Sequence, residues 1–293
     1  MKAIPATPAT AAATAPTSDR PASDLRVLPD PVDKEMGVFE YLSASRLKCW
    51  QGCRRQFYYR HIERIETPTA PALFLGQAVH ELLRLHNWSC WKDEPLEREK
   101  LRVELDQWWE REEPVARVRW KTSEEEATTR EQAWSLFEAY LEQPPIDAPG
   151  KPEGVEVRVD CDLGRGIPPL VGIIDLVRSP GVIIDYKTSA RSPDPAMAAH
   201  QHATQLSCYA LLFREATGRA ETGFELHYLI KTKQPKIAVH RLDPMTPAQE
   251  AELLFLIDDY LDGIAAERWI PSPGQHCAWC DYADRCRAQS GVG

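Results

Sequence analysis

Two carboxylates and an amine near the middle of the chain have the types and spacing that phosphodiester hydrolysis requires. Asp175 ends the run Gly-Ile-Ile, and Asp185 ends the run Val-Ile-Ile, with Lys187 two residues later. Carboxylate oxygens hold Mg²⁺ or Mn²⁺ while leaving positions for water and phosphate, and a nearby ammonium orients that water or offsets developing charge. Because Asp-x-Lys is also common at solvated strand ends, the chemistry depends on whether the fold brings the three groups together.

Two neighbouring strands are predicted to position this trio. Branched apolar residues fill 170–177 and 182–186, and a Ser-Pro-Gly turn signal separates the two runs. Side chains alternate across a strand, so Asp185 and Lys187 share one face while Tyr186 points to the other. The sequence therefore predicts one pocket that contains both acids and the lysine.

The surrounding pattern predicts an α/β fold, a mixed sheet flanked by helices. Helical periodicity is found at 44–61, 70–87, 96–113, 123–142, 195–216 and 246–268. Strand patterns are found at 155–161, 224–230 and 237–242. The charged, Trp-containing helices within about 90–145 are interpreted as a helical insertion that covers one side of the site or guides the substrate strand.

Four further side chains on these elements are candidates for the site. Glu156 lies on the strand at 155–161, and His80 lies on the helix at 70–87, where ordinary strand-surface and core roles are the alternatives. Gln205 and Tyr209 are four residues apart and share one helix face. Gln205 suits hydrogen bonds near a substrate backbone, and Tyr209 suits stacking on or bonding to a terminal nucleotide, with a plain surface pair as the alternative.

The cysteines indicate a metal rather than disulfides. The chain has eight of them and no secretion signal, and Cys277, Cys280 and Cys286 crowd together after a Pro- and Gly-containing segment in the region 271–288. Three thiolates leave a tetrahedral set one ligand short, and spacing does not separate zinc from a [4Fe–4S] cluster, because both accept four thiolates. Three others are interpreted as core packing: Cys90, Cys161 and Cys208.

Composition and charge bound the remaining possibilities. The 293 residues, 43% of them hydrophobic, can bury one large core or two modest ones and are too polar throughout for a membrane span. Residues 1–40, rich in Ala, Pro and Thr, are predicted to be a disordered tail, and 41–293 a single domain. No secretory or transit pattern is visible, so a cytoplasmic location and no membrane partner are expected.

The net charge of −9 does not exclude a nucleic-acid substrate, because phosphate binding needs only a local basic surface. Arg54, Arg55 and Tyr58, close to Cys53, are candidates for such a surface. A second basic cluster consists of Lys231, Lys233 and Lys236. An ordinary solvated face explains either cluster equally well.

Taken in order, these residues resemble the PD-(D/E)XK nuclease superfamily, in its RecB/AddB-like branch. Gly-Ile-Ile-Asp175 and Ile-Ile-Asp185-Tyr-Lys187 carry the resemblance, with Gly76-x-x-x-His80 upstream and Gln205-x-x-x-Tyr209 downstream. The resemblance implies a restriction-endonuclease-like fold and a metal-dependent DNA nuclease. It also implies that the family position of Glu156 is often acidic.

The resemblance assigns roles and a setting to these residues. His80, Asp175, Asp185 and the Tyr186 carbonyl would hold Mg²⁺ or Mn²⁺, and Lys187 would position the attacking water. Single-stranded DNA ends are the implied substrate, with exonuclease action, a free 3′ hydroxyl and a 5′ phosphate as products. The implied settings are DNA repair or recombination with a helicase, and CRISPR spacer processing with adaptation proteins.

The resemblance further implies a [4Fe–4S] cluster, as in the iron–sulfur exonucleases associated with CRISPR systems. Cys53 would join Cys277, Cys280 and Cys286 and tie the two ends of the fold together. Cys49 stays a rival, because it lies one helical turn earlier and Arg54 stands where the family usually has proline. Zinc stays the alternative metal.

A hypothesis from another class is a non-catalytic nucleic-acid-binding or assembly subunit with a structural metal site. The joint presence of His80, Asp175, Asp185 and Lys187 favours the nuclease, because a site freed from chemistry has no physical reason to keep a whole metal-ligating set. End polarity, exonuclease or endonuclease action, preference for DNA or RNA and oligomeric state stay open at this level.

Overall fold

The computed structural model describes residues 37–143, 151–164 and 166–291. Within these ranges one mixed sheet has the order β1 (Gly154–Cys161), β2 (Leu170–Arg178), β3 (Val182–Ser189), β4 (Gly223–Ile230) and β5 (Lys236–Leu242). Only β3 and β4 pair in parallel; the other neighbours are antiparallel. A parallel pair needs a crossover connection, and α6 (Pro195–Thr217) supplies it. The predicted α/β class is confirmed.

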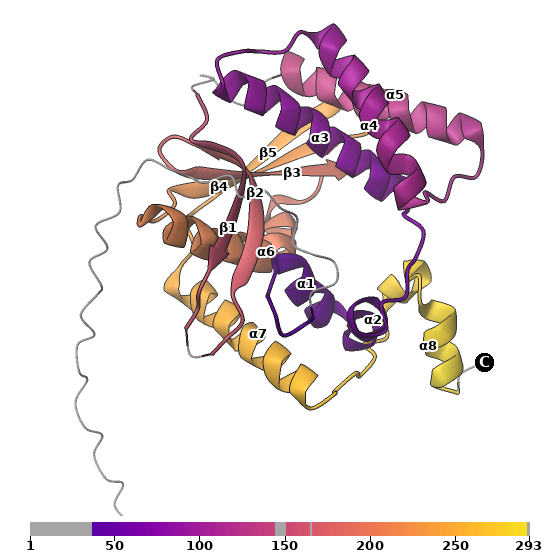
Figure 1. Ribbon diagram of the computed structural model, residues 1–293, viewed down its shortest axis with the longest axis vertical. Helices are drawn as coiled ribbons and strands as arrows, with labels where there is room; N and C mark the ends of the chain where they lie inside the picture. Colours follow the sequence, from indigo (N-terminus) through magenta and orange to yellow (C-terminus); the bar gives the residue numbers. More distant parts are fainter. Residues whose placement is uncertain (1–36, 144–150, 165, 292–293) are drawn as a thin grey trace, which may run out of the picture.

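Helices cover both faces of the sheet (Figure 1). One face carries α3 (Pro71–Trp91), α4 (Arg98–Ala116) and α5 (Ser123–Glu142), and the other carries α1 (Ala44–Gly52), α6 and α7 (Pro247–Ala265). Each face has its own hydrophobic core, because alternate residues of the strands point to opposite sides. Along β3, for example, Ile183 packs toward α6, whereas Ile184 and Tyr186 pack toward α3.

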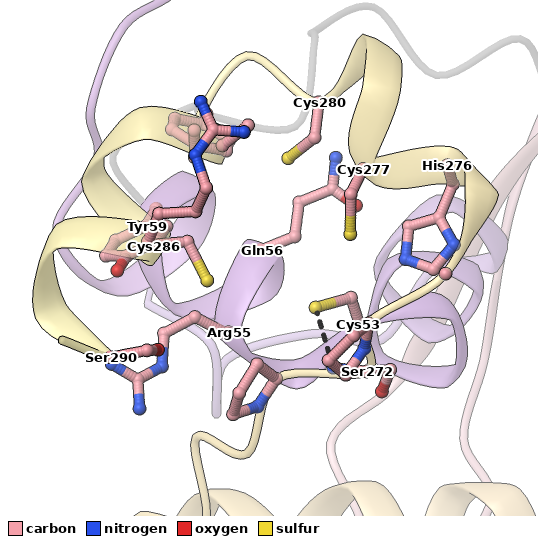
Figure 2. A pocket seen from close by; sticks show the side chains of 16 residues that line it. Cys53, Arg55, Gln56, Tyr59, Ser272, His276, Cys277, Cys280, Cys286 and Ser290 are labelled. Atoms are coloured by element: carbon pink, nitrogen blue, oxygen red, sulfur yellow. Dashed lines mark hydrogen bonds between the residues drawn. The ribbon is translucent and has the colours of Figure 1, made fainter. Parts of the chain in front are cut away.

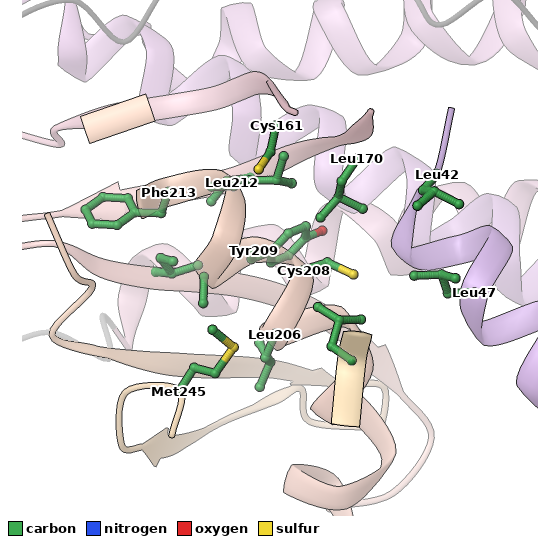
Figure 3. Close-up of a cluster of buried hydrophobic side chains, with 14 of the residues drawn as sticks. Leu42, Leu47, Cys161, Leu170, Leu206, Cys208, Tyr209, Leu212, Phe213 and Met245 are labelled. Atoms are coloured by element: carbon green, nitrogen blue, oxygen red, sulfur yellow. The ribbon is translucent and has the colours of Figure 1, made fainter. Parts of the chain in front are cut away.

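The region predicted to be a helical insertion is part of this second core. Leu105 and Trp109 of α4 and Phe137 of α5 are fully buried against α3. On the opposite face, Leu206, Leu212 and Phe213 of α6 pack beneath the sheet (Figure 3). Cys161 and Cys208 lie in that core, as predicted, but Cys90 is half-buried at the end of α3 rather than in the core. None of the described helices has the length and apolar character needed to cross a membrane.

The folded domain begins earlier than predicted. The predicted tail lies outside the described residues up to position 36, but residues 37–40 pack on the domain. Val38 is buried, and its carbonyl accepts a hydrogen bond from the Tyr260 hydroxyl at 3.2 Å. The Gly37 carbonyl accepts one from Arg46 at 3.0 Å. Composition does not mark a sharp boundary in this part of the chain, and the predicted boundary at position 40 lies a few residues after the start of the described domain.

The first predicted helix, 44–61, is three segments. α1 is capped by the Ser43 hydroxyl, which accepts from the Arg46 backbone N–H, and it ends at Gly52. Cys53 is extended, with φ −164° and ψ 112°, and is followed by α2 (Arg54–Phe57) and a π-helix (Tyr58–Ile62). Glycine weakens a helix end, and the turn of the backbone at Cys53 lets its sulfur accept from the Ser272 backbone N–H at 3.4 Å.

The cysteine-rich C-terminal segment folds back onto this broken helix (Figure 1). A 3₁₀ helix (Gln275–Trp279) and α8 (Ala283–Gln289), neither of them predicted, follow α7. The Tyr282 hydroxyl donates to the Ile65 carbonyl at 3.1 Å, and Tyr59 donates to Gln289. Both helical segments are too short to show a periodic pattern in the sequence, so hydrophobicity alone gave no sign of them.

Candidate active site

The two acids meet where β2 and β3 separate. The ladder between these strands ends at the pair Leu176–Ile184. The next two residues in the register would be Asp175 and Asp185, and they do not pair. The Tyr186 backbone N–H no longer pairs with β2 and donates instead to Asp175 Oδ2 at 3.0 Å. The fork between the strands therefore opens a polar gap at the centre of an otherwise apolar sheet, as required for a buried pair of carboxylates.

Asp185 and Lys187 face α6 on the side of the sheet predicted from strand alternation. Asp185 is 1% exposed, its Oδ2 lies 2.5 Å from Lys187 Nζ, and its Oδ1 accepts from Gln205 Nε2 at 3.0 Å. Lys187 also donates to Gln205 Oε1 at 3.2 Å. The Gln205 amide thus touches both members of the pair, using its donor end for the acid and its acceptor end for the amine.

Tyr209 acts one step further away. Its hydroxyl accepts from Gln205 Nε2 at 2.9 Å, and its ring is buried in the core beneath the sheet. The ring is 7% exposed, so of the two roles predicted for Tyr209 the geometry favours hydrogen bonding over stacking. The spacing of four residues places the pair on one helix face, and the tyrosine hydroxyl contacts the glutamine; its contact with a nucleotide stays a prediction.

His80 reaches the same gap from the opposite face. Its Nδ1 lies 3.5 Å from Asp175 Oδ2, and its Nε2 lies 2.9 Å from the Tyr186 carbonyl oxygen. Gly76, one turn earlier on α3, makes this possible, since a Cβ there would stand 3.2 Å from Thr188 Oγ1 of β3. The missing side chain lets the helix lie against the strand and brings the imidazole to the acids.

Glu156 of β1 stands opposite Asp175 of β2 in a strained conformation. The pairs Val155–Leu176 and Val157–Ile174 flank it, so the register sets Glu156 opposite Asp175 without pairing the two. Its φ of 48° is uncommon for a residue with a side chain, and Val155 and Val157 consequently pack on different faces of the sheet. The sequence predicted Glu156 as a candidate, and the structure adds it to the acid cluster.

Burial and mutual charge set the proton affinities of the acids apart. Burial raises the pKa of Asp185 to about 6 against the opposing effect of the Lys187 ammonium, and burial together with the Asp175 charge raises the pKa of Glu156 to about 7. Burial also acts to raise the pKa of Asp175, but the neighbouring His80 outweighs it and the pKa is lowered. Carboxyls with separated pKa values in one cleft are typical of a catalytic site.

Two cationic or polar groups at this site were not predicted. Burial and the Lys187 charge lower the pKa of Lys48 on α1, and the Asp185 charge opposes them, so the Lys48 ammonium interacts electrostatically with the pair. Burial lowers the pKa of His202 to about 4, and its Nδ1 is buried without a hydrogen-bond partner. His202 lies three residues before Gln205 on the same helix face, a spacing that was available in the sequence; Lys48 carried no comparable signal.

The donor set fits a divalent cation. Asp185 Oδ2 is buried, and its partner is the Lys187 ammonium at 2.5 Å. A buried carboxylate oxygen in this state is satisfied by a cation, and carboxylate, carbonyl and imidazole ligands suit Mg²⁺ or Mn²⁺. Among the residues that the structure describes, no three His, Cys, Asp or Glu side chains already surround one point. Ion binding would therefore require the side chains of His80, Asp175 and Asp185 to draw closer around one point.

The family model of the PD-(D/E)XK nuclease superfamily matches residues 41–287. The chain belongs to this superfamily. A crystal structure of a candidate exonuclease from Eubacterium rectale matches with 18% identity and a TM-score of 0.55, covering 84% of this chain and 88% of the other. A structure of SSO0001 matches with 15% identity and a TM-score of 0.43, covering 87% and 89%. No curated protein matches.

The superfamily core of this chain carries a separate pocket of cysteines. A cavity of about 310 Å³ is lined by Cys53, Cys277, Cys280 and Cys286, and Figure 2 shows their sulfurs turned toward it with Gln56 among them. Cys49 does not line it, and burial raises the pKa of its thiol to about 11. Of the two candidates for a fourth ligand, Cys53 therefore lies closer to the other three cysteines' cavity than Cys49 does.

The predicted nucleic-acid-binding residues of this nuclease-family chain lie beside the cysteine pocket. Arg54 forms an ion pair with Asp259 at 2.7 Å, and Arg55 donates to the Trp269 carbonyl at 2.7 Å and to Gln289 at 2.8 Å. Tyr58 donates to Glu63 at 3.3 Å. The contacts of Arg54 and Arg55 hold α7 and the C-terminal segment against α2, whereas the Tyr58 contact stays within the end of the π-helix.

Proposed function

We propose that the protein is a Mg²⁺- or Mn²⁺-dependent deoxyribonuclease that acts as an exonuclease on single-stranded DNA ends. The observation that carries this proposal is the convergence of Asp175, Asp185 and Lys187 at the fork of β2 and β3, with His80 entering from α3. Superfamily membership supports hydrolysis of a phosphodiester, and the candidate exonuclease with the same fold agrees with exonucleolytic action.

His80, Asp175, Asp185 and the Tyr186 carbonyl would hold the ion. When bound, Mg²⁺ or Mn²⁺ supplies Lewis-acid polarisation of the phosphate and lowers the pKa of a bound water. Lys187, fixed by Asp185 and Gln205, presents its remaining N–H donors to the attacking water and offsets charge on the phosphate oxygens. Glu156, with a pKa of about 7, can hold or release a proton near neutrality beside Asp175.

The test is a nuclease assay on end-labelled single- and double-stranded oligonucleotides with Mn²⁺. We expect stepwise loss of nucleotides from single strands by the wild type, and a fall of at least about 100-fold in kcat for Asp185→Asn and Lys187→Ala, since both act on the transition state. Degradation by the two variants at the wild-type rate would contradict the assignment. A wild type that degrades no substrate would favour the non-catalytic binding subunit.

We further propose that the cysteine pocket holds a [4Fe–4S] cluster, with Cys53, Cys277, Cys280 and Cys286 as ligands and zinc as the alternative. Four thiols lining one cavity support the ligand set. Gln56 must leave the space among the sulfurs for the ligands to close around the cluster.

Metal analysis distinguishes the two metals. Protein purified without oxygen should be brown and contain about four irons per chain, and Cys286→Ser should lose both. A colourless protein with about one zinc per chain would replace the cluster by a zinc site and leave the nuclease proposal intact.

The biological setting proposed here is cytoplasmic DNA repair or recombination beside a helicase, or CRISPR spacer processing beside adaptation proteins. Both settings provide the single-stranded ends that the proposed activity consumes. Co-purification with one of the two kinds of partner from the native cell would decide between them.

A further inference from the structure

A basic groove lies one helical turn beyond the active site. The groove has a volume of about 480 Å³ and lies between the start of α3, the start of α5 and the residue that follows β4. We call it the basic groove and define it by Leu75, Arg119, Lys121, Glu125, Thr129 and Lys231.

The groove is continuous with the active site through β3 and α3. The Lys231 backbone N–H donates to the carbonyl of Ser189, which ends β3 two residues after Lys187. Leu75 precedes Gly76, where α3 touches Thr188, and lies five residues before His80, which is about 8 Å along a helix. A polynucleotide strand that runs from the two aspartates along the end of β3 therefore enters this groove.

The charge of the groove is positive in a protein whose net charge is −9. Arg119 pairs with Asp281 at 3.3 Å, and the Glu125 carboxylate, which keeps its negative charge, accepts a hydrogen bond from the Lys121 backbone N–H at 2.7 Å. Within the described ranges no ion pair involves the ammonium group of Lys121 or Lys231. Two cations without counter-ions beside an acid cluster attract a polyanion, and phosphate is the anion that the proposed chemistry supplies.

We propose that the basic groove binds backbone phosphates of a single-stranded polynucleotide a few nucleotides from the scissile bond. This rests on the nuclease function proposed above. Pockets of about 300–1,000 Å³ hold one drug-sized molecule, so the groove has room for one or two nucleotides and not for a double helix. Lys121 and Lys231 fix the strand without reading its sequence.

The test compares two double charge reversals with the same change in net charge. Lys121→Glu/Lys231→Glu alters the groove, and Lys92→Glu/Lys100→Glu alters the far end of α3 and the start of α4, about 30 Å away along the helix. All are placed in an Asp185→Asn background, so that a labelled 12-nucleotide single strand stays intact, and binding is followed by fluorescence anisotropy over a range of salt. Thermal unfolding checks that each protein is folded.

We expect the groove reversal to weaken binding about tenfold or more and to reduce the slope of log K against log salt by about 1.4, the value for two lost phosphate contacts to a single strand. The control reversal should behave as its parent. Equal binding of the strand by the two reversals would overturn the proposal. So would binding of an acidic peptide of the same length by the parent protein as tightly as the strand.

Catalysis separates this proposal from the one on which it rests. With Asp185 restored, the ratio of kcat/KM for the 12-nucleotide strand to that for a trinucleotide should fall about tenfold in the groove reversal relative to the control reversal. A wild type that cleaves neither strand would contradict the nuclease, whereas cleavage with an unchanged ratio would contradict the groove alone.

Discussion

Gln205 is the residue on which the geometry of the acid–amine pair depends. Its amide bonds Asp185 at 3.0 Å, Lys187 at 3.2 Å and the Tyr209 hydroxyl at 2.9 Å, so a single side chain contacts both of the proposed catalytic groups. Without it, Asp185 Oδ1 would be buried with no donor, and Lys187 would keep only its contact with Asp185 Oδ2. A residue that acts in this way positions others and need not touch the substrate.

Replacement of Gln205 by alanine should therefore affect the chemical step. We expect kcat to fall about 10- to 100-fold while KM for a single strand changes little, because the lost contacts orient the transition state and not the bound strand. Steady-state kinetics with Mn²⁺ checks this. Thr204→Ala is the control, since Thr204 is the preceding residue of α6 and bonds only Gln51 in the described structure; the account is contradicted if both variants keep the wild-type kcat.

At this scale the sequence predicted the principal groups but not all of their uses. Asp-x-Lys on a strand predicts a shared face, and the observed contact of 2.5 Å between Asp185 and Lys187 follows from it. Strand alternation gave no sign that Glu156 has a positive φ, because a local break that sends Val155 and Val157 to different faces of the sheet leaves no pattern of residue types. Lys48 approaches from a separate helix, and such tertiary placement leaves no local pattern.

At the scale of elements, the packing of α7 against α1 depends on one glycine. A Cβ at Gly263 would stand 2.1 Å from the ring of Trp50, which is fully buried and donates to Asp259 at 2.8 Å. Trp50 also contacts the rings of Phe57, Tyr260 and Trp269. The indole has no room to move, so the two helices keep their spacing only while position 263 lacks a side chain.

Gly263→Ala should destabilise the protein. Overpacking costs about 1–3 kcal/mol, and the better helix propensity of alanine recovers about 1 kcal/mol, so we expect a net loss of up to about 2 kcal/mol. Urea unfolding measures it. Gly52→Ala is the matched control, because nothing lies within 4 Å of a Cβ at that position of α1; a variant at 263 as stable as this control would contradict the packing described.

The π-helix that follows α2 should make the fold acid-sensitive. Burial, with a contribution from nearby arginines, lowers the pKa of His61 to about 4, whereas the unfolded chain keeps a value near 6.5. Between these values the unfolded state binds the extra proton, so stability is retained above about pH 6.5 and lost as the pH falls toward 4, by about 1–3 kcal/mol after discounting for partial exposure.

His61→Phe tests this contribution. Phenylalanine keeps the ring that packs on Phe57 at a centroid distance of 4.6 Å but carries no titratable group. We expect the free energy of unfolding to depend less steeply on pH between 6.5 and 4 in the variant than in the wild type, measured by denaturant titration at each pH. Parallel pH curves for the two proteins would show that His61 does not contribute.

Elements with strong periodicity were predicted well, and those shaped by tertiary contacts were not. The helix 123–142 was predicted to the residue, because the Thr122 side chain caps it and an apolar face runs along its length. The helix 44–61 was predicted as one piece although it breaks at Cys53, since helical periodicity continues through a turn that is set by contact with Ser272.

At the scale of the whole molecule, the proposed cluster would join segments from opposite ends of the sequence. Cys53 follows α1, and Cys277, Cys280 and Cys286 belong to the last segment, whose other ties to α2 and the π-helix include Arg55 with Gln289 and Tyr59 with Gln289. A ligand bridge across so long a stretch of chain restricts the unfolded state and holds the terminal segment in place.

Loss of one proposed ligand should loosen that segment first. We expect Cys286→Ser to make the region 271–289 cleavable by trypsin, which cuts beside Arg285 and Arg287, while the sheet stays protected. Mass spectrometry of the limited digest checks this. Cys90→Ser, at a half-buried thiol outside the cavity, is the control; identical digests of the two variants would contradict a tie through the cysteines.

The central claim is that a divalent ion binds among His80, Asp175, Asp185 and the Tyr186 carbonyl, and the most direct measurement is anomalous X-ray scattering from crystals soaked in Mn²⁺. The account predicts one strong anomalous peak within about 2.0–2.6 Å of oxygen atoms of both aspartates, and its disappearance in Asp185→Asn. A manganese peak elsewhere, or none at the fork of β2 and β3 in the wild type, would contradict it.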